Sequence, residues 1–321
     1  MKYRRLGRTA LRVSELCLGT MNFGPRTPQP EAFDMLNAAV AGGINFIDTA
    51  NQYGGHLGVG TTEKILGAWF AEDRSRRDKV VLATKVHEPM SEDINDRGLS
   101  ARHIQQACDE SLRRLGVEHI DLYQMHHLDR SAPFDEVWQA MDRLVSQGKI
   151  TYVGSSNFPG WCIAQANERA AASHRLGIVS EQSLYNLIER RAELEVIPAC
   201  VSYGVGMIIW SPLAGGLLAG QSKESEGRRG SPELQAQVEA RRAQLGAFEA
   251  LAADLDVTPS SLALAWLLHQ PSVVSTIIGP GTQSQLSSVM AVPDIELGAQ
   301  TLARLDEIFP PCGAAPEAYA W

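Results

Sequence analysis

Four side chains that can exchange protons follow short apolar segments of the chain: Asp48, Tyr53, Lys85 and His126. The three segments before them are residues 44–47, 80–84 and 120–125, each of a length and composition typical of a buried strand. If these strands are parallel members of one barrel, their carboxyl ends meet on the face where barrel enzymes carry out their chemistry. The pattern therefore indicates an enzyme.

Each of the four residues has a role that follows from its chemistry. We expect Tyr53 to be the proton donor, because the ammonium of Lys85 stabilises a phenolate and lowers the pKa of the phenol. Asp48 is expected to hold Lys85 in place and to balance its charge. His126 is expected to orient a substrate oxygen or to relay its proton. Taken singly, these residues also suit a helix cap, a surface aromatic and solvated strand ends, and their recurrence at successive strand ends favours catalysis.

Strand-like and helix-like patterns alternate along most of the chain. Eight strands are predicted at residues 15–19, 44–48, 80–85, 120–126, 150–154, 178–179, 206–210 and 273–278. Helices are predicted at residues 31–41, 63–71, 100–115, 134–147, 161–175, 193–201 and 261–269, with Ser100 as an N-cap. Such alternation implies parallel strands joined by crossover helices, and eight units favour an α/β fold, the (β/α)8 TIM barrel. A doubly wound sheet is the alternative, but its ligands gather at one switch point rather than after almost every strand.

The segments outside the eight units are assigned as well. A small β-hairpin is expected over residues 3–13, a long loop over residues 221–231, and a tail over residues 310–321 that folds over the barrel mouth. No change in composition marks a domain boundary, so residues 1–321 are predicted to form a single domain.

The composition narrows the range of partners and compartments. The net charge of −8 is spread without a basic face, so neither nucleic acid nor an anionic membrane is an expected partner. The five cysteines are scattered and form no CxxC pair, which is typical of buried thiols in a reducing compartment rather than of disulfides or a metal site. Neither a signal-peptide pattern nor a run of about 18 apolar residues is present, so we predict a cytoplasmic protein.

Beyond these patterns, the chain resembles the aldo-keto reductases over essentially its full length. The likeness is carried by the segments Leu16–Gly24, Asn45–Gly54, Ala83–Lys85, Asp121–His127, Tyr152–Phe158, Glu181–Asn186 and Trp210–Leu218. The resemblance implies that the catalytic residues of the family fall on Asp48, Tyr53, Lys85 and His126. The spacing after the sequence DLYQM selects His126 rather than its neighbour His127.

The resemblance also implies a nicotinamide cofactor that lies across the barrel mouth and is bound without a Rossmann fingerprint. The segment Gly58–Gly60 lacks the third glycine of that fingerprint and is predicted to be a loop turn. The residues implied near the nicotinamide are Gly19, Thr20, Met21, Asp48, Ser156, Asn157, Gln182 and Trp210. Among them Ser156, Asn157 and Gln182 suit a carboxamide, since hydroxyl and amide groups meet both its donor and its acceptor. Trp210 is expected to stack on the ring, with a core position in its strand as the alternative.

The rest of the cofactor is implied to lie on loops with glycines, where backbone N–H groups approach phosphate closely. The residues implied at the pyrophosphate are Ser211, Pro212, Leu213, Gly215 and Leu217. Those implied at the adenosine end are Gly279, Gly281, Thr282 and Gln285, which carry no positive charge for a 2′-phosphate. Arg228 and Arg229 are expected to supply that charge, so NADP(H) is the predicted cofactor and NAD(H) the alternative.

Within the family, the chain resembles the bacterial NDP-hexose 2,3-enoyl reductases and the potassium-channel β-subunit-like branch. The segments that carry the first likeness are Asn95–Ile104, Ser111–Ala140 and Arg190–Val196. The resemblance implies reduction of an aldehyde or ketone, because His126 is retained where the enoyl-reducing steroid branch has glutamate. Enoyl C=C reduction on an NDP-hexose and a cofactor-sensing regulatory subunit are the alternatives. The expected substrate pocket comprises Phe23, Tyr53, Trp69, His87 and His126, with Trp321 of the tail.

Overall fold

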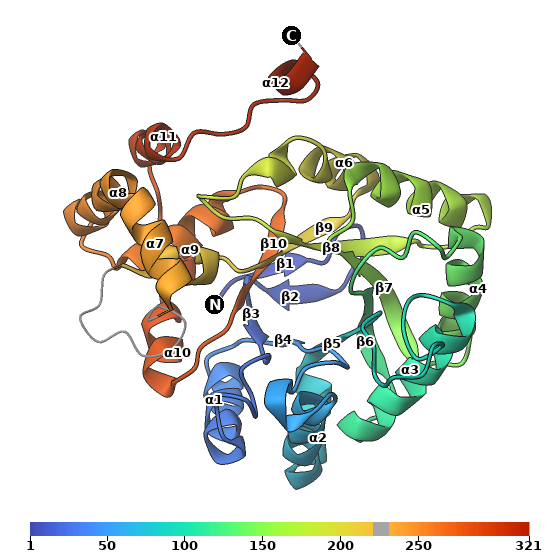
Figure 1. The fold of residues 1–321 in the computed structure, drawn as a ribbon. Helices are drawn as coiled ribbons and strands as arrows, with labels where there is room; N and C mark the ends of the chain where they lie inside the picture. Colours follow the sequence, from blue (N-terminus) through green and yellow to red (C-terminus); the bar gives the residue numbers. More distant parts are fainter. Residues whose placement is uncertain (221–230, 321) are drawn as a thin grey trace.

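The computed structural model describes residues 1–220 and 231–320 (Figure 1). Its centre is a closed barrel of eight parallel strands, hydrogen-bonded in the order β10, β3, β4, β5, β6, β7, β8, β9. The barrel strands are β3 Leu16–Gly19, β4 Phe46–Asp48, β5 Val81–Val86, β6 Ile120–Met125, β7 Ile150–Ser156, β8 Ile178–Leu184, β9 Gly206–Trp210 and β10 Val273–Ile278. An antiparallel hairpin precedes them, formed by β1 Tyr3–Arg5 and β2 Arg12–Ser14. The fold is the predicted (β/α)8 TIM barrel with its N-terminal hairpin.

Helices surround the barrel and cover the outer faces of its strands (Figure 1). The helices of the described residues are α1 Gln29–Ala41, α2 Thr61–Glu72, α3 Ala101–Leu115, α4 Phe134–Ser146, α5 Gly160–Ala172, α6 Val196–Tyr203, α7 Pro232–Ala240, α8 Arg242–Asp254, α9 Pro259–His269, α10 Gln283–Val289, α11 Ala299–Ile308 and α12 Glu317–Ala320. Helix α9 carries a run of buried residues from Ser261 to Leu268, so it is enclosed on all sides rather than amphipathic. The main apolar core therefore lies between the strands and this helical layer.

A second, smaller apolar cluster fills the barrel interior. Its members are Leu6, Val13, Cys17, Phe46, Val81, Ala83, Leu122, Val179, Ile208 and Val274. Gly7 lies in the hairpin turn with a φ of +54°, and a Cβ there would be only 2.3 Å from the carbonyl oxygen of Val179. Because Val179 lies near the start of β8, the hairpin closes the amino-terminal end of the barrel.

The strands carry polar side chains to the opposite end of the barrel. Asp48, Lys85 and Gln124 each lie two residues after an interior apolar residue of β4, β5 or β6. Side chains alternate along a strand, so these three also point inward. Lys85 pairs in register with Gln124, and Asp48 pairs with Ala83, two residues before Lys85. The strand register itself therefore gathers three polar side chains above the apolar cluster.

Helix starts follow the local chemistry of their cap residues. The hydroxyl of Ser100 accepts a hydrogen bond from the backbone N–H of His103 at 3.2 Å, so the predicted N-cap of α3 is confirmed. Thr258 caps α9 in the same way, with 3.1 Å between its hydroxyl and the nitrogen of Ser261. Such bonds satisfy backbone donors that the first helical turn leaves without partners.

The described residues also depart from the sequence-based expectations. Strand β8 runs to Leu184, well beyond the predicted residues 178–179, because polar residues continue the strand where an apolar pattern ends. Helices α7 and α8 lie in a stretch where no helix was predicted. The expected loop at residues 221–231 falls almost entirely outside the described residues.

The carboxyl-terminal tail lies outside the barrel rather than over its mouth. Figure 1 shows it leaving α11 and running away from the strands to the short helix α12. Residues 316–320 are exposed, and the hydroxyl of Tyr319 donates to Glu195, just before α6, at 3.3 Å. Alanine, glycine and proline dominate this segment, so it has little apolar surface to bury against the mouth.

Two further expectations concern compartment and cysteines. In the described residues no single helix has the length and apolar composition to cross a membrane, although α8 and α9, bent by 87° at their junction, would pass as a pair on those criteria alone. Four of the five thiols are buried as predicted, whereas Cys312 of the tail is half-buried.

Candidate active site

A buried ion pair occupies the carboxyl-terminal end of the barrel. Lys85 Nζ lies 2.5 Å from Asp48 Oδ2 and 2.8 Å from the carbonyl oxygen of Thr49, and the side chain of Lys85 is 0% exposed. Burial alone would lower the pKa of Lys85, but Asp48 and Tyr53 outweigh it and raise that pKa. Lys85 is therefore an ammonium group at neutral pH, held in one position by two acceptors.

Two amides complete the environment of Asp48. Its Oδ1 accepts hydrogen bonds from Gln124 Nε2 at 3.0 Å and from Gln182 Nε2 at 2.8 Å. These two donors and the ammonium of Lys85 together fix the orientation of the Asp48 carboxyl group. Gln124 was not predicted as a site residue, although its inward position two residues after Leu122 was the signal that could have identified it.

Tyr53 approaches this pair from the loop after β4. Its hydroxyl oxygen is 3.4 Å from Lys85 Nζ, and the ammonium also lies over the phenol ring, 5.1 Å from its centroid. Burial raises the pKa of Tyr53, the charge of Lys85 lowers it in part, and the net direction is upward. The expectation of a lowered pKa is thus corrected, because burial outweighs the ammonium. Tyr53 keeps its proton at neutral pH.

His126 follows β6 and faces Tyr53 across the mouth. The two ring centroids are 6.0 Å apart, and the backbone N–H of His126 donates to Val86 at 2.9 Å. His126 is 8% exposed, and within residues 1–220 and 231–320 its buried Nδ1 has no hydrogen-bond partner. Burial, with added repulsion from Lys85, lowers the pKa of His126 to about 2. The imidazole is therefore neutral.

Asp48, Tyr53, Lys85 and His126 are called the tetrad below. Further polar and aromatic side chains lie beside the tetrad, at the ends of β7, β8 and β9. Asn157, with a φ of +59°, accepts a hydrogen bond from Trp210 Nε1 at 3.0 Å and donates to the carbonyl oxygen of His126 at 3.2 Å. Ser156 donates to the carbonyl oxygen of Gln182 at 2.9 Å. The indole of Trp210 is only half-buried. One amide thus fixes both a partly exposed indole and the backbone at His126.

The loop after β9 has a backbone suited to anion binding. Ser211, Ala214, Gly215 and Gly216 all have positive φ, from 49° to 115°. Among the described residues, no atom lies within 4 Å of a Cβ placed on Gly215. Successive residues in such conformations can aim N–H groups at a phosphate. In this structure the N–H of Gly215 donates to Ser211 Oγ at 3.2 Å and that of Gly216 to the carbonyl oxygen of Leu213 at 2.9 Å, so an anion would have to replace these acceptors. Pro212 and Leu217 of this predicted set are buried, and so only their backbones are available.

The remaining predicted cofactor residues lie on the β3 and β10 sides of the mouth. Thr20 is buried and donates to the carbonyl oxygen of Asp48 at 2.9 Å, whereas Met21 is 44% exposed. The side chains of Thr282 and Gln285 form hydrogen bonds at the N-terminus of α10. Thr282 accepts from the nitrogen of Gln285, and Gln285 accepts from the nitrogen of Gly281 at 2.7 Å. Their side chains are occupied by helix capping.

Other predicted cofactor residues are glycines or lie outside the described residues. Gly19 ends β3 against β10, where a Cβ would be 2.5 Å from a side-chain atom of Ile277, and Gly279 accepts from Asn22 at 3.0 Å. Arg228 and Arg229 fall outside the described residues, as does Trp321.

The expected pocket residues divide into two groups. His87 lies at the mouth, with its ring 5.5 Å from that of His127. Phe23 is fully buried below the loop after β3. Trp69 does not belong to the pocket: it is 1% exposed and its indole donates to Asn37 of α1 at 2.9 Å. Its place on the barrel-facing side of α2 explains the difference, since a core position and a pocket position show the same apolar residue in sequence.

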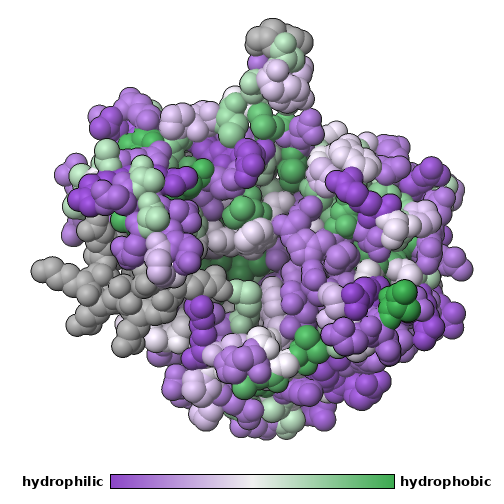
Figure 2. Space-filling model, in the orientation of Figure 1, coloured by the Kyte–Doolittle hydropathy of each residue, from purple (hydrophilic) through white to green (hydrophobic). Residues whose placement is uncertain are grey.

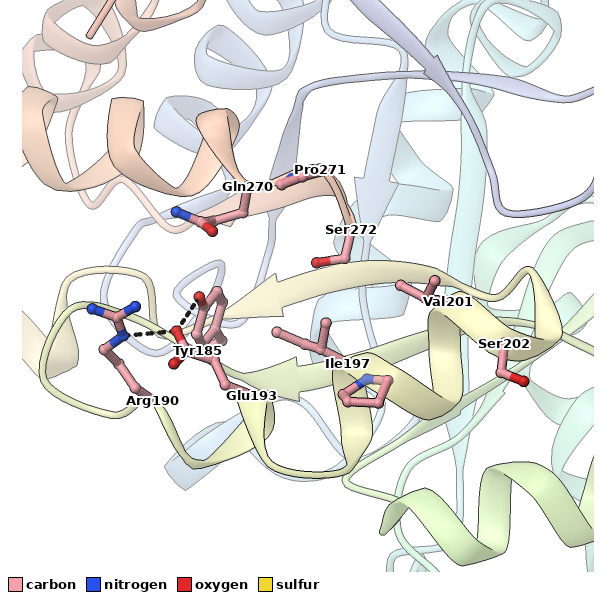
Figure 3. Close-up of a pocket in the computed structure, with 10 residues that line it drawn as sticks. Tyr185, Arg190, Glu193, Ile197, Val201, Ser202, Gln270, Pro271 and Ser272 are labelled. Atoms are coloured by element: carbon pink, nitrogen blue, oxygen red, sulfur yellow. Dashed lines mark hydrogen bonds and ion pairs between the residues drawn. The ribbon is translucent and has the colours of Figure 1, made fainter. Parts of the chain in front are cut away.

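Two surface grooves elsewhere carry no comparable chemistry. One of about 670 Å³ lies between α6 and the turn before β10 (Figure 3), where Glu193 binds both Tyr185 and Arg190. Another of about 530 Å³ lies between α4 and α5, near Trp161. Neither includes a member of the tetrad. By contrast, Figure 2 shows the molecule hollowed near its centre, in line with the ring of strands in Figure 1.

Comparison with known proteins agrees with this geometry. The model of the aldo/keto reductase family matches residues 15–309. A Bacillus subtilis protein named uncharacterized oxidoreductase YrpG is 47% identical over 100% of both chains. A probable voltage-gated potassium channel subunit beta of Arabidopsis thaliana is 31% identical, over 99% of this chain and 100% of its own. Versiconal hemiacetal acetate reductase of Aspergillus parasiticus is 30% identical, over 98% and 99%.

These matches define the class of the protein. The chain belongs to the aldo/keto reductase family and is an NAD(P)H-dependent oxidoreductase. The residues present fit a nicotinamide cofactor: Trp210 offers a partly exposed ring held in place by Asn157, and the loop at Gly215 offers an exposed glycine with no other described residue within 4 Å of its Cβ position. Those two places are suited to the ring and to the pyrophosphate of one extended molecule.

Proposed function

We propose that the protein reduces an aldehyde or ketone carbonyl to an alcohol with NADPH. The observation that carries this proposal is the placement of the Tyr53 hydroxyl 3.4 Å from Lys85 Nζ, which is itself bound to Asp48. A phenol, an ammonium and a carboxylate in this order form a proton donor whose conjugate base is stabilised by charge. The half-buried indole of Trp210 is linked to the same end of the barrel through Asn157, which bonds both Trp210 Nε1 and the carbonyl oxygen of His126.

Each residue of the site has a part in the reaction. When bound, the cofactor supplies the hydride. Tyr53 gives its proton to the oxyanion that develops on the carbonyl oxygen, and Lys85 stabilises the phenolate that remains. Asp48, held by two amides, keeps Lys85 in place. His126 is neutral, so it donates a hydrogen bond to the carbonyl oxygen without delivering a proton of its own.

The test of this mechanism is the variant Tyr53→Phe. It should lower kcat for carbonyl reduction by at least about 100-fold, the usual contribution of a positioned general acid. Binding of NADPH, followed by fluorescence titration, should be nearly unchanged. Tyr152→Phe, which removes the hydroxyl of a half-buried tyrosine on β7, is the control and should keep full activity. Wild-type turnover in Tyr53→Phe would exclude this role for Tyr53.

The same assay separates carbonyl reduction from its two alternatives. NADPH oxidation is followed with 4-nitrobenzaldehyde, with a simple diketone and with an NDP-4-keto-enoyl sugar. Turnover of the first two supports carbonyl reduction, and turnover of the sugar alone would favour enoyl reduction. Tight NADPH binding with turnover of none of them would favour a cofactor-sensing subunit, as the likeness to a channel subunit beta suggests.

NADP(H) rather than NAD(H) is the proposed cofactor, although its support lies in the sequence. The side chains of Thr282 and Gln285 are engaged in capping α10 and offer no charge to a 2′-phosphate. The preference therefore depends on Arg228 and Arg229. Titration of protein fluorescence with NADPH and NADH should show tighter binding of NADPH, and replacing both arginines with alanine should remove the difference. Equal affinities in the wild type would contradict the proposal.

A further inference from the structure

We propose that Glu88, His126 and His127 form a binding site for a divalent transition-metal ion such as Zn²⁺, and that the bound ion inhibits the enzyme. One ligand atom from each of these residues lies within 4.8 Å of the other two. Two imidazoles and one carboxylate, with a position left for water, are a ligand set that zinc uses in proteins. The ion would lie at the barrel mouth, beside the proton donor.

The fold brings these ligands together through two adjacent strands. Val86, the last residue of β5, pairs in register with Met125, the last residue of β6. Glu88 follows the first strand by two residues, and the two histidines follow the second directly. The backbone N–H of His126 also donates to Val86 at 2.9 Å, which fixes one loop against the other. The ligands are therefore set by the barrel rather than by a long loop.

The spacing of the ligand atoms suits a tetrahedral ion. His127 Nε2 is 3.1 Å from Glu88 Oε1. Two ligand atoms at zinc distances and a tetrahedral angle are about 3.3 Å apart, so this pair needs little movement. The rings of His126 and His127 stack with centroids 5.0 Å apart and an interplanar angle of 13°. An imidazole binds a metal ion in the plane of its ring, so His126 must turn out of this stack before both rings can point a nitrogen at one ion. A shift of His126 by about 1.5 Å would bring its nitrogen to the same spacing.

The three proposed ligands differ in exposure: His126 is buried, whereas His127 and Glu88 are partly exposed to solvent. His126 is 8% exposed and its Nδ1 lacks any hydrogen-bond partner in the described part of the chain, so the ring is not committed to an acceptor there. The side chains of His127 and Glu88 are 45% and 26% exposed, which leaves a path for the ion. Lys85 is the nearby cation, but Asp48 Oδ2, 2.5 Å from its ammonium, balances that charge.

The surroundings predict reversible rather than permanent binding. When Nε2 of His127 holds an ion, the ring proton lies on Nδ1, which is 3.5 Å from the amide nitrogen of Asn157. Tight zinc sites instead place an acceptor at that position. We therefore expect a dissociation constant in the micromolar range, suited to an inhibitory ion and not to a structural one.

The inhibitory effect rests on the proposed function. An ion on His126 draws this ring away from the orienting role proposed for it and occupies the barrel mouth beside Tyr53, whose ring centroid is 6.0 Å from that of His126. Inhibition should therefore be competitive with the carbonyl substrate. It should leave NADPH affinity unchanged, because neither Trp210 nor the loop at Gly215 supplies a ligand.

Isothermal titration calorimetry with Zn²⁺ tests the site without any turnover. The full-length protein with Cys312→Ser, which removes the half-buried thiol, should bind one Zn²⁺ at micromolar concentration. Glu88→Gln and His127→Asn in that background should each weaken binding at least tenfold. His119→Asn is the control, since His119 also lies near a carboxylate, 3.6 Å from Asp121, and should not alter the titration. Equal binding by the Cys312→Ser parent and by its His127→Asn variant, or no binding by the parent, would overturn the site.

Steady-state kinetics test the inhibition separately. In EDTA, Glu88→Gln and His127→Asn should reduce carbonyl substrates at close to the wild-type rate. With added Zn²⁺ the wild type should show an increased KM for the carbonyl, and the two variants should resist this effect at least tenfold. Full activity at saturating Zn²⁺ would overturn the inhibitory role. A protein that binds Zn²⁺ by calorimetry but reduces no carbonyl would instead show that the proposed function has failed.

Discussion

At the scale of single residues, the site is defined by the balance between burial and nearby charge. Sequence spacing identifies Asp48, Tyr53, Lys85 and His126 as candidates, and the structure gathers all four at one end of the barrel. Spacing does not reveal how deeply each side chain is buried. For this reason the predicted lowering of the Tyr53 pKa is wrong in direction, since burial exceeds the effect of Lys85. Burial likewise lowers the pKa of His126 and leaves the imidazole neutral, which supports the orienting role proposed for it.

The role of Lys85 gives a prediction at this scale. Lys85→Met removes the charge that lowers the pKa of Tyr53 and stabilises its phenolate, so the pKa of Tyr53 should increase further. We expect kcat for carbonyl reduction to fall by at least about 100-fold. Lys64→Met replaces an exposed lysine of α2 and is the matched control. Retention of more than a tenth of wild-type kcat would show that the ammonium is dispensable.

A buried carboxyl group next to the site gives a prediction about pH. Glu181 is fully buried, and burial raises its pKa from 4.5 to about 7 despite hydrogen bonds from Ser183 and the N–H of Phe158. The native carboxyl thus binds its proton more tightly than the unfolded one. The free energy of unfolding should therefore decrease as the pH increases from about 5 to about 8, by at most about 3 kcal/mol.

Glu181→Gln isolates this contribution, because glutamine is neutral throughout the range. Urea unfolding of the two proteins at pH 5 and pH 8 should show the variant gaining stability relative to the wild type at the higher pH. A constant difference between the two proteins across this range would mean that Glu181 is ionised in the native state at both values.

At the scale of elements, the alternation of strand and helix patterns and the presence of cap residues predict the helices and strands better than apolar runs alone. The barrel and the start of α3 follow from strand–helix alternation and from Ser100. Strand β8 is underestimated because Glu181, Gln182 and Ser183 are polar, and this polarity reflects their place beside the site. Helix α7 buries only Leu234 among its residues, so its sequence lacks the apolar stripe that predicts a helix. Functional strand ends and peripheral helices are thus the parts that sequence patterns miss.

The cap of α3 gives a prediction at this scale. Ser100→Ala removes the acceptor for the N–H of His103, which the fold leaves without another helical partner. The free energy of unfolding should fall by about 1 kcal/mol. Ser146→Ala, at the exposed last residue of α4, lacks a cap role and should change stability by a few tenths of a kcal/mol at most. Indistinguishable urea midpoints for the two variants would argue against the cap.

At the scale of the whole molecule, the sequence predicts the closed barrel but not how the last segments attach to it. The tail was expected over the mouth, and the structure instead places it outside. The attachment of α11 includes pairings between residues more than 100 positions apart, which periodicity cannot show. That residues 1–321 form a single domain remains a prediction.

Arg190 makes the long-range contacts between the loop after β8 and the end of α11. Its guanidinium binds Glu193 at 2.7 Å, Asp306 of α11 at 2.6 Å and the carbonyl oxygen of Phe309 at 2.8 Å, and it lies over the ring of Trp266 in α9. The side chain is 8% exposed, so these contacts form away from water. One cation therefore joins the loop after β8 to two helices at the outer wall of the barrel.

Replacing Arg190 tests whether its buried contacts contribute more to the free energy of unfolding than an exposed ion pair does. Arg190→Ala leaves Glu193 without its cation and frees the end of α11, so the free energy of unfolding should fall by about 3 kcal/mol. Arg191→Ala is the matched control, because its side chain is 76% exposed and its pair with Glu189 lies in water, where such a pair contributes less than about 1 kcal/mol. Urea unfolding compares the two. Since the contacts of Arg190 are to Glu193, α9 and the end of α11 and not to the catalytic candidates, kcat of the folded Arg190→Ala protein should stay within about twofold of wild type, as expected for sites that are independent. Similar losses of stability in both variants would mean that burial gives Arg190 no special part in the fold.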